Sequence, residues 1–161
     1  MDLLALDKQL CFALAAASRS VISLYRPILE PLGLTHPQYL VMLGLWEDDG
    51  QTLGQLARAL HLEPATLSPL VKRLEASGLI TRNRRPADER AVEIRLTDAG
   101  RALRLQAEEV PVKVVAELGW SIPELEALKD TLTQLLADST SARSDRGAGG
   151  RQACADARLR A

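Results

Sequence analysis

The amino-acid sequence predicts a mainly α-helical fold with one small β-hairpin, arranged as a winged helix-turn-helix. Apolar residues recur every three or four positions through most of the chain, which is the spacing of one helical face. The spacing changes to alternation only around residues 79–96, as in a two-stranded hairpin. Two short helical segments joined by a tight turn come directly before that hairpin, and this order of elements indicates the fold class.

The composition is that of a single domain of ordinary size. The chain has 161 residues, of which 47% are hydrophobic, and this is enough for a core. No apolar run reaches the roughly 18 residues of a membrane span, and the first ten residues carry acids where a secretory signal is basic. We therefore expect a cytoplasmic protein with no membrane partner. Cys11 and Cys154 lie far apart without metal-ligand spacing, so we expect no metal, no cofactor and no disulfide framework.

The net charge of −1 hides a segregation of charge along the chain. Residues 64–104 hold nine Lys or Arg against five Asp or Glu, whereas residues 105–137 hold two against six and residues 1–63 hold four against seven. A basic segment inside an acidic frame is typical of a protein with one face on nucleic acid. A solvated charged hairpin explains the same counts, and charge alone does not separate these interpretations.

Four helices are predicted before the hairpin. The apolar spacing places them at residues 6–29, 36–46, 53–60 and 64–77. Pro37 is tolerated in the first turn of the second helix. The expected stops are Pro27, Pro31 and Gly33 for the first helix, Asp48-Asp49-Gly50 for the second, and Gly78 for the fourth.

The second half of the chain begins with the hairpin and continues as helices. Alternating residues at 79–82 and 92–96 flank a polar tip at 83–90. Thr97-Asp98 then caps a long helix that is interrupted near Pro111, and Ser121 with Glu124 forms a capping box for a last helix. Residues 139–161 have almost no large apolar side chain, and we expect them to be a disordered tail.

The helices of residues 1–34 and 100–138 bracket a module of residues 35–99. These outer helices are more apolar than one small core requires, so we expect them to pack against a partner. A symmetric homodimer is the simplest arrangement, with dimerisation helices outside and a DNA-binding module between them.

In a helix-turn-helix the second helix enters the major groove, and its N-terminal residues reach base edges. Here that helix begins at Pro64, and Pro69 inside it predicts a slight bend. The spacing predicts a buried face of Leu67, Leu70, Val71 and Leu74, and an outer face of Thr66, Ser68, Lys72 and Arg73. The outer hydroxyls suit contacts with bases or phosphates, and the two cations suit phosphates.

The hairpin tip, residues 84–90, mixes arginines with acids. An arginine that enters the minor groove meets concentrated negative potential, and Asp88 can hold Arg90 extended by ion pairing. A solvated loop with surface salt bridges is the alternative. The position directly after a helix-turn-helix favours a DNA-binding wing.

Residues 34–100 resemble the MarR family of bacterial transcriptional regulators. The resemblance is carried by GLTHPQYLVMLGLWE, by LEPATLSPLVKRLEASGLITR, by the wing tip Asp88-Glu89-Arg90 and by the closing LTDAG, and it extends over nearly all of residues 6–137. It implies a triangular homodimer whose terminal helices form the interface and whose two winged modules bind a near-palindromic double-stranded DNA operator. It places Thr66, Ser68, Pro69, Lys72 and Arg73 in the recognition helix, and Arg82, Asp88 and Arg90 in the wing.

Within this family, residues 6–12, Ser18-Arg19 and residues 24–27 are similar to the organic hydroperoxide resistance regulators. The resemblance implies that Cys11 is the peroxide sensor and that tyrosine hydroxyls from across the dimer hold its thiolate. Tyr25 matches one of those tyrosines, whereas His36 stands in place of a second and Ala15 in place of a third.

The thiolate needs donors or positive charge to lower the thiol pKa from its free value of about 8.5. A protonated His36 can supply this, but a neutral His36 is equally explained as a residue at a helix start, and Cys11 as a small buried hydrophobe.

The predicted sensor has an organic hydroperoxide as its oxidant. No resolving cysteine lies between Leu103 and Asp138, so an oxidised Cys11 would pair with a small cellular thiol, and Cys154 is expected to be incidental. One alternative is a MarR-type repressor that is released by a small aromatic or phenolic ligand, with Cys11 structural. The other is a thiol peroxidase, for which the chain shows neither a peroxidase-like motif nor a redox thiol pair, so we expect a regulator and not an enzyme.

Overall fold

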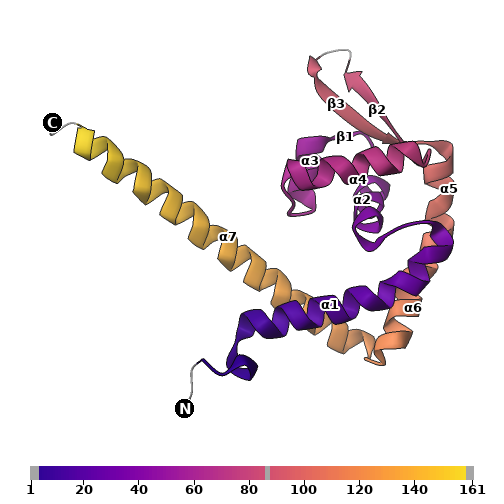
Figure 1. Ribbon diagram of the computed structural model, residues 1–161, viewed down its shortest axis with the longest axis horizontal. Coiled ribbons are helices and arrows are strands. Elements are labelled where there is room, and N and C mark those ends of the chain that lie inside the picture. The colour runs from indigo at the N-terminus through magenta and orange to yellow at the C-terminus, as the bar shows by residue number, and fades with distance from the viewer. Residues whose placement is uncertain (1–3, 86–87, 159–161) are drawn as a thin grey trace. The chain divides into compact units, whose positions relative to one another are not determined.

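The computed structural model describes the backbone of residues 4–85 and 88–158, and the side chains of residues 4–83 and 92–141. The chain divides into two compact units, Met1–Glu117 and Leu118–Ala161. The first unit contains the winged helix-turn-helix, and the second consists mainly of one long helix (Figure 1).

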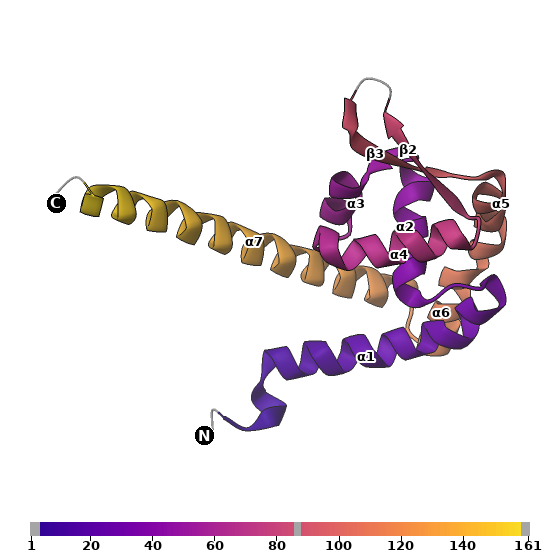
Figure 2. The same cartoon turned by 45° about the horizontal axis from the view of Figure 1, so that its top comes forward.

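The first unit is helical with a small antiparallel sheet, as the sequence predicts. In Figure 1 and Figure 2 the strands β2 and β3 project as a hairpin beside α3 and α4. Two 3₁₀ turns, Leu6–Lys8 and Glu30–Leu32, flank α1. The helices of this unit are α1 (Leu10–Leu29), α2 (His36–Glu47), α3 (Leu53–Ala59), α4 (Pro64–Ala76), α5 (Asp98–Ala107) and α6 (Glu109–Leu118). The strands are β1 (Gln51–Thr52), β2 (Ile80–Arg85) and β3 (Asp88–Leu96).

Local capping chemistry explains where the helices begin. Thr35 and Gln38 form a capping box at α2, and Thr52 and Gln55 form another at α3. Thr97 Oγ1 accepts a hydrogen bond from the Gly100 backbone N–H at 3.0 Å, which confirms the predicted cap of α5.

The predicted end of α4 at Gly78 is also confirmed. Gly78 has φ +76°, its N–H donates to the Glu75 carbonyl, and the next N–H, of Leu79, reaches back to the Leu74 carbonyl. This is the Schellman arrangement, and it turns the chain from the recognition helix into the wing.

The sheet has the order β1-β3-β2, with Ile80 opposite Leu96 and Gln51 opposite Ile94. The strands run further toward the tip than the alternation at 79–82 and 92–96 predicts, because β2 reaches Arg85 and β3 starts at Asp88. Strand β1 is not predicted, since two residues are too short to show alternation.

One core lies under the sheet and among the helices of the first unit. Its buried side chains come from the helices and from strands β2 and β3, and Val110 and Val114 extend the core along α6. The largest are Leu29, Met42, Leu45, Leu56, Leu67, Leu74, Ile80 and Ile94. Leu29 is the one buried residue of α1, so this helix has little packing of its own within one chain.

Two helix ends differ from the sequence prediction. Pro27 does not close α1 but lies in its last turn, where the missing proline N–H removes one hydrogen bond. The helix ends at Leu29, and the 3₁₀ turn that follows it ends at Gly33, which has φ +67°. The break near Pro111 is present as a step at Glu108 between α5 and α6, three residues before the proline.

The second unit contains α7 (Ile122–Arg158). The Glu124 half of its predicted capping box is present, because Glu124 Oε2 accepts hydrogen bonds from the Ser121 N–H and hydroxyl. The prediction of a disordered tail from residue 139 differs from the structure, in which α7 continues to Arg158. Alanine and arginine are strong helix formers, so a segment without an apolar face can still be helical. Among the described residues, no helix is long and apolar enough to span a membrane.

Candidate DNA interface and sensor residues

The recognition helix α4 presents the predicted buried and outer faces, except at Leu70 and Ser68. Leu67, Val71 and Leu74 are buried, whereas Leu70 is only half-buried. Thr66, Pro69, Lys72 and Arg73 are exposed and therefore available to a groove. Ser68 is half-buried and lines a cavity of about 120 Å³ between α4 and the sheet, so it faces the wing rather than open solvent.

The turn before α4 holds His61 in a left-handed conformation. Its φ is +52°, and among the described residues it is the one non-glycine with positive φ. The next residue, Leu62, donates its N–H to the Ala57 carbonyl at 2.9 Å, which closes the turn. The tight reversal between α3 and α4 is thus held by backbone geometry that a β-carbon resists.

Arg82 at the base of the wing is paired with the recognition helix. Its Nε donates to Glu75 Oε2 at 2.7 Å, and a second guanidinium nitrogen lies 2.5 Å from the same oxygen. This side-chain hydrogen bond lowers the pKa of the Glu75 carboxyl below its usual value. The sequence predicts Arg82 as a DNA contact, whereas the structure shows it holding β2 against α4. Asp88 and Arg90 belong to β3 by backbone, but their side chains, and the ion pair predicted between them, lie outside the described residues.

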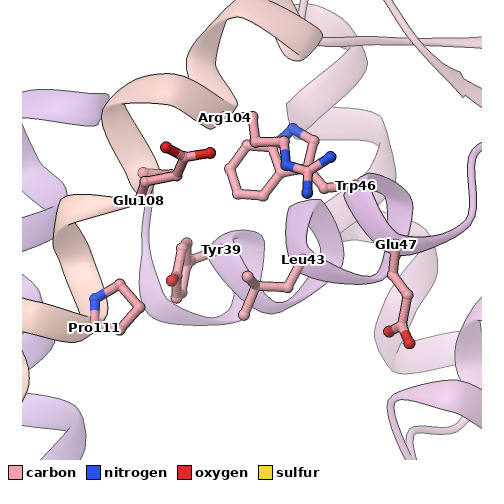
Figure 3. A pocket seen from close by; sticks show the side chains of 8 residues that line it. Tyr39, Leu43, Trp46, Glu47, Arg104, Glu108 and Pro111 are labelled. Atoms are coloured by element: carbon pink, nitrogen blue, oxygen red, sulfur yellow. The ribbon is translucent and has the colours of Figure 1, made fainter.

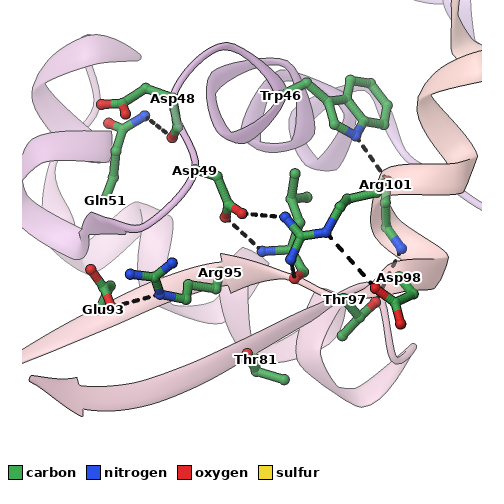
Figure 4. Close-up of polar contacts among 12 residues, drawn as sticks. Trp46, Asp48, Asp49, Gln51, Thr81, Glu93, Arg95, Thr97, Asp98 and Arg101 are labelled. Carbon is green, nitrogen blue, oxygen red and sulfur yellow. Dashed lines mark hydrogen bonds and ion pairs between the residues drawn. The ribbon is translucent and has the colours of Figure 1, made fainter.

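A polar cluster that sequence reasoning missed joins the end of α2, the end of β3 and the start of α5 (Figure 4). Asp49 Oδ1 accepts from the Leu96 N–H at 2.8 Å, and Asp49 Oδ2 pairs with the Arg101 guanidinium at 2.5 Å. Arg101 also donates to the Leu96 carbonyl at 2.9 Å. The sequence shows Asp48-Asp49-Gly50 only as a helix stop, because nothing local predicts a partner 52 residues away.

Gly100 is required by a close backbone approach at the same place. A β-carbon at this position would overlap the Leu79 carbonyl oxygen, so the first turn of α5 lies directly on the start of the hairpin. The Trp46 indole Nε1 donates to the Gly100 carbonyl at 2.9 Å. The winged module and the first turn of α5 are therefore fastened together.

The structure brings two of the three predicted sensor residues together. The rings of Tyr25 and His36 are in edge contact, with centroids 5.0 Å apart. Cys11 is exposed and lies fourteen residues before Tyr25 on α1, which at the helical rise is about 21 Å away. Within one chain, Cys11 therefore does not reach Tyr25 or His36.

Partial burial changes the titration of both rings. Desolvation lowers the pKa of His36 and raises the pKa of Tyr25, so neutral imidazole and neutral phenol are the favoured forms at neutral pH. Of the two roles considered for His36, its surroundings therefore favour a neutral ring at the start of α2 over a protonated imidazole.

Two cavities lie along α2. The first, of about 630 Å³, is lined by side chains of α2 and of the α5–α6 region, including Tyr39, Trp46 and Arg104 (Figure 3). The second, of about 710 Å³, lies along α1 and the start of α2, where it is lined by Arg19, Arg26 and His36 among others. Among the described residues, no three His, Cys, Asp or Glu side chains lie together in a way that could hold a metal ion.

Comparison with known proteins settles the family. The family described as "Transcriptional regulator SarA/Rot" matches residues 23–105, about half of the chain. An organic hydroperoxide resistance transcriptional regulator of Bacillus subtilis is 42% identical over 135 residues, which are 84% of this chain and 92% of the relative. The chain belongs to the MarR family of transcriptional regulators.

Solved structures of MarR-family regulators share its fold. Reduced AbfR bound to DNA is 38% identical with a TM-score of 0.66, covering 81% of this chain and 91% of AbfR. CouR bound to a 23-mer DNA duplex is 27% identical with a TM-score of 0.75, covering 84% of this chain and 97% of CouR. AbfR of Staphylococcus epidermidis has also been solved overoxidised on DNA and with a disulfide formed, and CouR of Rhodococcus jostii with p-coumaroyl-CoA. The MarR-family chain described here is accordingly a DNA-binding transcriptional regulator and not an enzyme.

Proposed function

We propose that this MarR-family regulator is a homodimeric repressor that leaves its operator when an organic hydroperoxide oxidises Cys11. The observation that carries the proposal is the exposed thiol of Cys11 on α1, in a chain that is 42% identical over 135 residues to the Bacillus subtilis relative named for organic hydroperoxide resistance. The reduced, overoxidised and disulfide forms of AbfR support a redox role for a regulator of this shape.

DNA recognition in this proposal is carried by the exposed face of α4 and by the wing. Thr66 reaches base edges in the major groove, and the exposed Lys72 and Arg73 hold phosphates beside it. Arg90, as the sequence predicts, enters the minor groove from the wing. Two such modules in a homodimer bind a near-palindromic operator with half-sites about one helical turn apart.

The chemical step is a transfer of one oxygen. The Cys11 thiolate attacks the terminal peroxide oxygen, the O–O bond breaks, and the organic part leaves as an alcohol after taking a proton. The resulting sulfenic acid then condenses with a small cellular thiol, which forms a mixed disulfide and releases water. The added bulk no longer fits the reduced packing of the helices.

A second copy completes the sensor pocket. Because Cys11 lies about 21 Å along α1 from Tyr25, the Tyr25 and His36 that meet it come from the partner chain. Exposed apolar side chains near the thiol support this packing, since Leu6 is 61% exposed and Leu10 is 64% exposed in the single chain.

The test uses an operator selected from a random duplex pool by the reduced protein, with binding followed by fluorescence anisotropy. Cumene hydroperoxide should lower the operator affinity of the wild type, while Cys11→Ser should bind as tightly and ignore the peroxide. Cys154→Ser is the matched control and should respond as the wild type does. A Cys11→Ser protein that still releases the operator contradicts the proposal.

A second candidate function is favoured by the cavity of about 630 Å³ beside Tyr39 and Trp46. It is large enough for an aromatic ligand, and Arg104 on its wall can pair with a carboxylate. The complex of CouR with p-coumaroyl-CoA supports such a role. On this proposal a phenolic acid releases the operator equally from the wild type and Cys11→Ser, and Arg104→Ala weakens that response.

A further inference from the structure

Four aromatic rings form a series from α1 to the far end of α2. Tyr25 contacts His36 at 5.0 Å and Tyr39 at 6.0 Å between ring centroids, and Tyr39 contacts Trp46 at 6.3 Å. Positions 36, 39 and 46 share one face of a helix, so α2 alone aligns three of the rings. The fourth, Tyr25, comes from α1, the helix that carries the proposed sensor thiol.

The series ends at the base of the winged module. The Trp46 Nε1 donates across from α2 to the Gly100 carbonyl of α5. Gly100 is itself held by the Thr97 hydroxyl and by its contact with Leu79, so this turn cannot shift without the start of the hairpin. Figure 4 shows the Trp46 indole directed at the first turn of α5, and Trp46 is thus the point at which the rings join the base of the wing.

We propose that Trp46 is a positioning residue that passes a displacement of Tyr25 and His36 to the first turn of α5, and through it to the winged module. The inference rests on the proposed release by Cys11 oxidation. The Tyr39 side chain is buried and its ring contacts Tyr25 on one side and Trp46 on the other, so a moved Tyr25 displaces Tyr39, and Tyr39 displaces Trp46. The indole hydrogen bond then requires α5 to follow or the bond to break.

A second tie at the same place serves as an internal contrast. Asp49 and Arg101 also hold the start of α5, but they belong to the polar cluster and not to the ring series. Loss of the Asp49 pair therefore loosens the base without interrupting the ring series, whereas loss of the Trp46 donor interrupts the series where it meets α5.

Nuclear magnetic resonance can observe the proposed displacement directly, because the chain has two tryptophans and therefore two indole N–H signals. Trp46→Phe assigns them. On stoichiometric oxidation with cumene hydroperoxide, the Trp46 signal of the wild type should move. In Tyr39→Leu the Trp46 signal should stay although mass spectrometry shows Cys11 oxidised. A Trp46 signal that is unmoved in the oxidised wild type overturns the inference, whatever any variant does.

Operator binding supplies the functional measurement. Trp46→Phe keeps a ring but removes the hydrogen-bond donor. Oxidation should therefore lower the operator affinity of this variant by a factor up to about ten times smaller than in the wild type. Trp120→Phe, the matched control, should lose as much affinity as the wild type. Asp49→Asn should also keep the full response.

The outcomes separate this inference from the proposed function. A wild type that keeps its operator after Cys11 is oxidised overturns the proposed function and the inference with it. A wild type that releases the operator, beside a Trp46→Phe variant that is equally oxidised and releases it equally, overturns the role of Trp46 alone.

Discussion

The base of the wing and the N-terminal helix are held in opposite ways. At the base, hydrogen bonds and ion pairs tie residues about 50 positions apart, as between Trp46 and Gly100 or Asp49 and Arg101. Along α1, one residue of twenty is buried, and Cys11 is exposed. Since switching elements come from regions of low local stability, the sparse packing of α1 within one chain suits the proposed switch, and the base is the part that moves as a unit.

The largest expected effect tests whether the base is rigid. Gly100→Ala places a β-carbon on the Leu79 carbonyl, which is backbone and cannot move aside, so it should destabilise the fold by about 3 kcal/mol. Urea unfolding measures this loss. Gly54→Ala in α3 is the control, because a β-carbon there meets nothing within 4 Å and should stabilise by about 0.5–1 kcal/mol. Equal stability of the two variants would mean that the base can adjust.

A smaller effect is expected from the polar cluster alone. Asp49→Ala removes the acceptor of the Leu96 N–H and the partner of Arg101, both partly exposed to solvent, so a loss of about 1–2 kcal/mol follows. The control is Asp130→Ala on α7, whose pair with Lys129 is exposed and should be worth less than about 0.5 kcal/mol. Chemical denaturation of both variants compares the part-buried contacts of Asp49 with an exposed surface pair.

The exposed face of α4 should affect DNA binding without affecting the base. Lys72→Ala should lower the slope of log affinity against log salt by about one, because it neutralises one phosphate fewer. Lys129→Ala, on the second unit, should leave that slope unchanged. The measurement is operator affinity at several salt concentrations, and an unchanged slope for Lys72→Ala would place this residue away from the DNA backbone.

The smallest expected effect concerns pH at the other end of the ring series. Burial lowers the folded-state pKa of His36 below the value in the unfolded chain, so the unfolded chain takes up the proton first. The stability from neutral His36 is complete above about pH 6.5 and falls as the pH drops through the folded-state pKa. When the pH is lowered from 7.5 to 5.5, the urea midpoint should therefore decrease more in the wild type than in His36→Leu. His61→Gln, which keeps His36, should show the same decrease as the wild type.

Much of the candidate DNA interface is predictable from short stretches of sequence. The outward positions of Thr66, Lys72 and Arg73 follow from helical periodicity alone. The role of Arg82 does not, because its pairing with Glu75 depends on how β2 lies against α4. The same holds for the sensor residues: a resemblance names Cys11, Tyr25 and His36, but only the tertiary structure shows that the rings of Tyr25 and His36 are in contact.

By itself the sequence determined the class of fold, the order of its elements and most helix ends, since caps such as Thr97 and Ser121 and the stop at Gly78 act within a few residues of chain. Only the tertiary structure decided the two-residue strand β1, the joining of Asp49 to Arg101 and the bond from Trp46 to Gly100. These depend on distant segments meeting in a folded core. Local propensity carries no information about a partner that lies fifty residues away, and the free energy of such a contact exists only once the core has brought both sides together.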